Sequence, residues 1–187
     1  MKKKLLLGVG ILLSFSLALG STKEIMETPV EIVEGVMNSI GYDHPLWDIS
    51  IDTEDNGVRI YSFRIEIKSG NDYDKIDNLK LSLVPLEAPR GTTSYGAEFE
   101  VIVSGRRNGA TEYKNKQANA IFQKVLEQTE QVTLIEALTP KYILGTYAGF
   151  IAIKDQVGLQ QLLTQIEMIV EKIDKDGLEN VIGVLPH

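Results

Sequence analysis

The strongest constraint on the fold is a regular alternation of apolar and polar residues. It recurs in residues 47–51, 63–67, 79–83 and 97–103, with Ile102 as an exception in the last of them. A strand with this pattern has one apolar and one polar face. Strands buried on both faces, as in a parallel sheet, are apolar throughout. The alternation therefore predicts an antiparallel sheet with one face on a helical layer and the other open to solvent.

Two details of the first strand pairing follow from the residues between the strands. Asn56-Gly57 is typical of a two-residue hairpin loop, because both central positions of a type I′ turn need positive φ. Val58 and Ile60 are out of phase with the apolar positions that come after them. This mismatch predicts a β-bulge near Tyr61.

Three helices are expected. The first covers residues 29–40, since Thr28 as N-cap, Pro29 at the first helical position and Glu31 three residues after the cap form a capping box. A second runs from Ala110 to about residue 131. A third, wide in its apolar stripe, follows Asp155 and ends before Gly177.

For the remaining segments the sequence leaves two alternative structures open. Residues 132–138 fit either a continued helix or a strand, and residues 142–153 fit one bent strand or a hairpin. The apolar tail from Leu178 fits docking on the domain or an edge strand. Together the patterns predict a single α+β domain over residues 29–187, in two layers, with an antiparallel sheet of about five strands and three helices packed on one face.

Residues 1–20 have the three parts of a secretory signal peptide. Three lysines at positions 2–4 precede an uncharged apolar run over residues 5–19, and Ala18 and Gly20 have the small side chains of a peptidase site. We expect cleavage after Gly20 or Ala18, export to the periplasm or the extracellular space, and membrane contact only during export. Retention of the segment as an amino-terminal anchor is the alternative. A polar leader over residues 21–28 would follow.

The composition limits the classes of partner. The chain has no cysteine, which excludes disulfides and the cysteine-linked anchor of bacterial lipoproteins. Three of its 19 basic residues lie in residues 1–20, so the remaining 16 face 26 acidic residues and the net charge becomes −10. This acidic balance argues against nucleic acid as a partner. No motif indicates a cofactor, and we expect none.

Asp52, Glu54 and Asn56 are weak candidates for metal ligands. With Gly57 they resemble the start of an EF-hand loop, which places oxygen ligands at alternate positions. The glutamate that closes such a loop at its twelfth position is here Phe63. We therefore favour an acidic hairpin turn over a calcium site.

His44, with Asp43 beside it and Asp48 four residues further on, is a weak catalytic candidate. A histidine next to a carboxylate can act as a general base. The more ordinary interpretation is a surface histidine bonded within a short connection. Arg106 and Arg107 are weak candidates for anion binding, because they precede the helix expected from residue 110 and helix N-termini favour anions. Their alternative is a solvated turn.

Two functions remain from different classes. The preferred hypothesis is an exported bacterial binding or accessory protein, not an enzyme, that meets a protein or small-molecule partner in the cell envelope with the polar face of its sheet. That face would carry Asp48, Ser50, Arg64, Glu66, Lys80, Glu98 and Glu100. The alternative is a small exported hydrolase that uses carboxylates and His44. A sheet edge or the apolar tail is also compatible with a homodimer.

Overall fold

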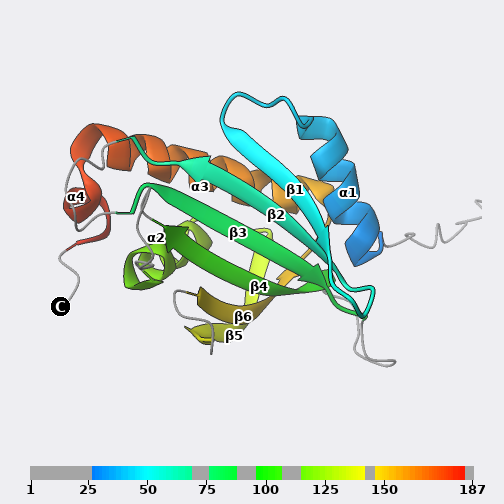
Figure 1. Cartoon of the computed structure of the whole chain (residues 1–187). Helices are drawn as coiled ribbons and strands as arrows, with labels where there is room; N and C mark the ends of the chain where they lie inside the picture. The colour runs from blue at the N-terminus through cyan, green and yellow to red at the C-terminus, as the bar shows by residue number, and fades with distance from the viewer. Residues whose placement is uncertain (1–26, 69–75, 88–95, 107–114, 142–145, 184–187) are drawn as a thin grey trace, which may run out of the picture.

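The computed structural model describes residues 27–68, 76–87, 96–106, 115–141 and 146–183 (Figure 1). In chain order its elements are α1 (Pro29–Ile40), β1 (Trp47–Thr53), β2 (Arg59–Glu66), β3 (Asn78–Pro85), β4 (Ala97–Arg106), α2 (Asn115–Leu126), β5 (Val132–Pro140), β6 (Thr146–Ile153), α3 (Gln156–Asp176) and α4 (Leu178–Ile182).

All six strands form one antiparallel sheet in the order β1-β2-β3-β4-β6-β5. The first four strands are a meander. The chain then leaves β4 through α2 and returns as β5 at the far edge, and β6 fills the place between β4 and β5. The α+β class and the antiparallel sheet are confirmed. The described residues hold six strands and four helices, where about five and three were expected.

The helices cover one face of the sheet, which we call the inner face. Figure 1 shows α3 passing behind β1, β2 and β3. The alternation that predicted the sheet is confirmed on this face, because the apolar positions of β4 are buried and the polar positions between them are only partly covered. Strands and helices share one core, whose largest buried side chains include Tyr61, Phe63, Phe99 and Phe122. Burial of each such side chain contributes about 1.5–3 kcal/mol.

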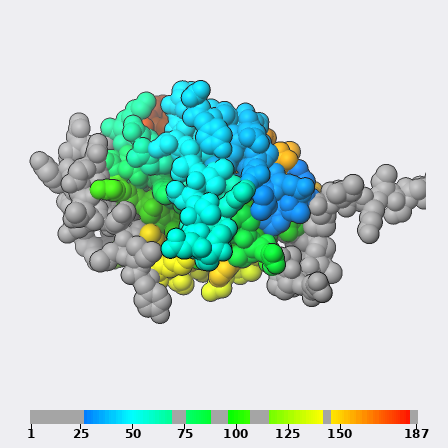
Figure 2. All heavy atoms as spheres, turned by 45° about the vertical axis from the view of Figure 1, so that its right-hand side comes forward, coloured from blue at the N-terminus to red at the C-terminus, as the bar shows by residue number. Residues whose placement is uncertain are grey.

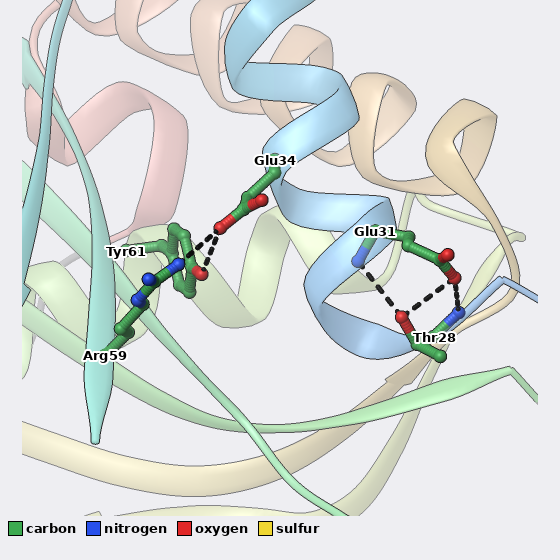
Figure 3. A network of polar contacts seen from close by, with 5 residues as sticks. All are labelled: Thr28, Glu31, Glu34, Arg59 and Tyr61. Carbon is green, nitrogen blue, oxygen red and sulfur yellow. Dashed lines mark hydrogen bonds and ion pairs between the residues drawn. The ribbon is translucent and has the colours of Figure 1, made fainter. Parts of the chain in front are cut away.

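Helix α1 begins with the predicted capping box (Figure 3). The Thr28 hydroxyl accepts the backbone N–H of Glu31 at 3.2 Å, and the Glu31 carboxylate accepts the backbone N–H of Thr28 at 2.8 Å. Two amide groups that the helix itself leaves without partners are thereby satisfied. The backbone N–H of Thr28, followed by the Thr28 hydroxyl, which also donates to the Glu31 carboxylate at 2.8 Å, holds the pKa of Glu31 below its ordinary value.

A second polar cluster joins α1 to β2 (Figure 3). One oxygen of the Glu34 carboxylate accepts the Tyr61 hydroxyl at 2.8 Å and the Arg59 guanidinium at 2.9 Å. Burial raises the pKa of Tyr61, and the bond to Glu34 adds to the rise. The β1–β2 hairpin and α1 consequently lie side by side on the surface (Figure 2).

Helices α1 and α3 approach each other closely at Gly35. A Cβ at this position would lie 2.5 Å from the side chain of Gln156, at the start of α3. Gln156 also donates its backbone N–H to Glu27 at 3.3 Å, just before α1 begins. Glycine at position 35 therefore allows the contact between the middle of α1 and the start of α3.

The β1–β2 loop differs from the two-residue turn that Asn56-Gly57 predicts. The backbone N–H of Glu54 bonds to the carbonyl of Val58, and the N–H of Gly57 bonds to the carbonyl of Glu54, which leaves three residues in the loop. Gly57 has φ +85° and the Asn56 amide oxygen accepts the N–H of Val58. This is a four-residue turn followed by a left-handed glycine, the usual three-residue hairpin.

The bulge expected near Tyr61 is absent from the β1–β2 pairing, which runs without a shift from Trp47 to Thr53. Tyr61 is itself an inner-face residue in phase with Phe63, and Ile60 belongs to the opposite face. The expectation was wrong because it treated Ile60 as a core position.

Three further boundaries differ from the sequence-based expectation. Helix α2 ends at Leu126, before residue 131, because Gln128 and Thr129 form short turn bonds to Val125 and Leu126. The expected start at Ala110 lies outside the described residues. Residues 132–140 form strand β5, one of the two alternatives for residues 132–138, and the described part of residues 142–153 forms the single strand β6 and not a hairpin of its own. The tail from Leu178 begins as the short helix α4.

Candidate functional site

The face of the sheet opposite the helices, here called the outer face, carries charged side chains in register. Asp48, Arg64 and Lys80 lie side by side on β1, β2 and β3. Arg64 binds Asp48 at 2.9 Å, and both side chains are well exposed. Within the described residues, no helix covers this row. The face that the alternation predicted is therefore present and has exposed residues of both signs.

The neighbouring row of the outer face is drier. Ser50, Ser62 and Ser82 follow one another across β1, β2 and β3. Ser62 is fully buried and Ser82 nearly so, although neither is on the inner face. Their hydroxyls bond to each other at 3.0 Å, which satisfies both. The outer face thus has a row of serines, two of which are buried, beside the charged row of Asp48, Arg64 and Lys80.

Further along the sheet, the outer face has an ion pair and apolar groups. Lys141, just after β5, binds the carboxylate of Glu100 on β4. Phe150 on β6 lies opposite Glu100 and is partly exposed. This ion pair is less exposed than the pair of Arg64 and Asp48, because the Glu100 side chain is only 23% exposed.

A groove of about 700 Å³ lies at the end of the sheet where β1 begins and β2 ends. One wall is the connection from His44 to Leu46, another is the end of β2, and the third is the middle of α3. Its apolar residues are Pro45, Leu46, Trp47, Ile65, Met168 and Val170. Its volume is within the range of sites that bind small molecules or short peptide segments.

The wall that α3 contributes is acidic. Glu167, Glu171 and Asp174 are spaced four and three residues apart, so they share one side of the helix. Glu167 accepts the indole N–H of Trp47, which fastens α3 to the start of β1. Trp47 is almost fully buried and packs edge-on against Phe63, with ring centroids 6.1 Å apart.

His44 lines this groove but is engaged in its own connection. Its Nδ1 accepts the backbone N–H groups of Leu46 and Trp47, each at 3.3 Å. Among the described residues, no carboxylate bonds to His44: Asp48 is paired with Arg64, and Asp43 is exposed. A general base held in a triad needs such a carboxylate partner. For the hydrolase hypothesis, the described residues provide a cleft around His44 but no carboxylate bonded to it.

Of the metal-ligand candidates in the β1–β2 hairpin, Glu54 and Asn56 form hydrogen bonds within the loop itself. The Glu54 carboxylate accepts the side-chain amide of Asn56 at 3.1 Å, and the other amide atom of Asn56 is bonded to Val58. Asp52 lies on β1 opposite Ile60 and is exposed. Within the described part of the chain, no group of three or more His, Asp or Glu side chains is arranged to hold a metal ion.

Arg106 is the last residue of β4, and Arg107 lies outside the described residues. The described part of α2 begins nine positions after Arg106, so the structure does not place Arg106 at a helix N-terminus. Burial raises the pKa of Asp77, and the charge of Arg106 opposes that rise. A carboxyl group thus already lies within the electrostatic reach of Arg106 and would compete with an anion.

Sequence reasoning missed the groove. Its lining comes from three segments far apart in the chain, and only the fold brings them together. The one available signal was the acidic spacing of residues 167, 171 and 174 on the polar side of an amphipathic helix. Such spacing is usual for any solvated helix face, so it did not stand out.

Among the described helices, none has the length and apolar character required to cross a membrane. Comparison of the chain with known protein families, curated proteins and solved structures gives no significant match.

Proposed function

We propose that this chain is an exported binding protein, without catalytic activity of its own, whose outer face contacts a protein partner in the cell envelope. The observation that carries the proposal is the mixed-sign row of Asp48, Arg64 and Lys80, of which Asp48 and Arg64 are exposed and Lys80 is partly exposed. A row that runs from one negative charge to two positive charges favours a partner with the opposite order of charges. The signal-like segment over residues 1–20 supports export.

The mixed sign of this row bears on specificity more than on affinity. Exposed ion pairs contribute little free energy, about 0–1 kcal/mol. Misplaced like charges at an interface are costly, however, so a fixed order of charges discriminates between partners. An accessory protein that must select one envelope partner benefits from such a surface.

Site-specific photo-crosslinking in the producing cell tests this proposal. A crosslinking residue at Ser50 samples the outer face, and one at Asn38, exposed on α1, is the matched control. We expect a discrete adduct from Ser50 that is absent from Asn38. The charge reversal Lys80→Glu should abolish the adduct, whereas Asp55→Lys, at the tip of the hairpin, should not.

Two outcomes contradict the proposal. One is an adduct from Asn38 equal to that from Ser50, which would indicate non-specific proximity. The other is an adduct from Ser50 that Lys80→Glu leaves unchanged, because the charged row would then play no part in recognition.

A further inference from the structure

We infer that the groove between α3 and the start of β1 is a second binding site, which takes a short basic peptide segment with an apolar side chain between Lys or Arg residues. The inference deepens the proposed function, since it assigns a chemistry to one part of a partner. The groove shares Asp48 and Arg64 with the charged row of the outer face, but the inference rests on Leu46, Glu167, Met168 and Glu171, which the row does not include.

The first argument is the balance of charge around the groove. Five acidic side chains line it, against two basic ones and His44. Arg64 is paired with Asp48, so among the described lining residues Lys68 is the basic side chain that remains beside Glu66, Glu167 and Glu171. The field inside the groove is therefore negative and attracts a cationic occupant.

The second argument is the apolar lining. Leu46 and Met168 are about half exposed, at 47% and 56%. Large apolar side chains exposed within one groove are typical of a binding site. Methionine suits such a surface, because its unbranched side chain adapts to different occupants. An apolar side chain of the occupant would lie between these two residues.

The third argument is length. Glu167 and Glu171 lie about 6 Å apart along α3 at the usual helical rise. An extended peptide covers about 3.3 Å per residue, so its residues i and i+2 are about 6.6 Å apart, close to the spacing of the two glutamates. These glutamates would then face two basic residues of the occupant, with the apolar residue between them. A small inorganic cation would use the charge but not the apolar lining.

Trp47 provides a direct readout, because it is the single tryptophan of the chain and lines the groove. Its indole N–H is bonded to Glu167, so an occupant that engages Glu167 shifts the indole signal in NMR and the tryptophan fluorescence. The probe is a blocked peptide Lys-Leu-Lys-Leu-Lys, titrated into the chain that begins at Ser21.

We expect this peptide to shift the Trp47 indole signal in a saturable manner, and Glu171→Lys to weaken its binding about tenfold or more. Asp55→Lys makes the same change of charge at the other end of β1 and should leave the binding unchanged. Met168→Ser should weaken binding without altering the net charge. The variants should keep the far-ultraviolet circular dichroism of the wild type.

Several outcomes overturn the inference. One is no shift of the Trp47 signal. Another is equal weakening by Glu171→Lys and Asp55→Lys, which would mean attraction to the overall charge. A third is equal affinity for Lys-Ser-Lys-Ser-Lys or for spermidine, which would remove the apolar contribution. Lys80→Glu should not affect the peptide, so failure here is distinguishable from failure of the outer face in crosslinking.

Discussion

At the scale of single residues, Gly96 and Gly41 separate two reasons why a glycine is needed: a positive φ angle and a lack of space for a side chain. Both have positive φ, +78° and +81°. Around Gly41 nothing lies within 4 Å of an added Cβ, whereas at Gly96 the added Cβ would be 2.2 Å from the carbonyl oxygen of Ile153. Gly96 therefore allows β4 to begin directly against the end of β6.

We expect Gly41→Ala to lower the free energy of unfolding by about 1 kcal/mol, the cost of strained φ alone. Gly96→Ala adds a backbone clash and should cost about 3 kcal/mol or more. Urea unfolding of the two variants measures both values. An equal decrease in the free energy of unfolding of the two variants would contradict this expectation. It would show that the start of β4 moves to accommodate the added Cβ without a loss of stability.

At the scale of elements, the bond from Tyr61 to Glu34 connects α1 to the sheet. Removal of the hydroxyl in Tyr61→Phe should lower the free energy of unfolding by about 1 kcal/mol at neutral pH. Because the folded-state pKa of Tyr61 is raised above its ordinary value, this contribution is complete below pH 10 and is lost as pH rises through the folded pKa. The difference between wild type and variant should therefore shrink at alkaline pH.

Chemical denaturation at a series of pH values measures this difference. Tyr42→Phe is the matched control, since Tyr42 is 57% exposed. Its effect should be near zero at every pH. A difference between wild type and Tyr61→Phe that stays constant into the alkaline range would contradict the bond to Glu34.

Elements with strong local signals were predictable from the sequence. The capping box at Thr28 and Glu31 set the start of α1, and the alternation in β4 marked its inner face. Strand β5 was not predictable in the same way. Its pairing with β6 shifts register twice, and Leu134 and Ile135 are both exposed, so no clear period of two is present. Its place as an edge strand depends on the whole sheet.

The candidate sites were predictable to different degrees. The charged row of the outer face follows from the alternation, because residues on one face of adjacent strands become neighbours once the register is set. The burial of Ser62 does not follow, since the alternation alone places Ser62 on the solvent-facing side of the sheet. Groove residues such as Met168 and Leu46 are 122 positions apart, and no local pattern joins them.

At the scale of the whole molecule, one core connects the groove to the far side of the sheet. Trp47 on β1 and Phe99 on β4 belong to the same cluster of buried residues, together with α1, α2 and α3. Phe99 is fully buried and lies opposite Pro85 and Ile151 in the strand pairing. If residues 29–187 form a single domain, loss of packing at Phe99 must also weaken the structure around Trp47.

This expectation gives a direct test of the domain prediction. In the chain that begins at Ser21, Phe99→Ala should lower the free energy of unfolding by about 3–5 kcal/mol. The urea midpoint from Trp47 fluorescence should fall together with the midpoint from far-ultraviolet circular dichroism, because small single domains unfold in one transition. A dichroism midpoint that falls while the Trp47 midpoint stays would mean that β1, the groove and α3 unfold separately from the rest of the sheet. The groove would then sit on a unit with its own stability, and ligand binding there would stabilise only that unit.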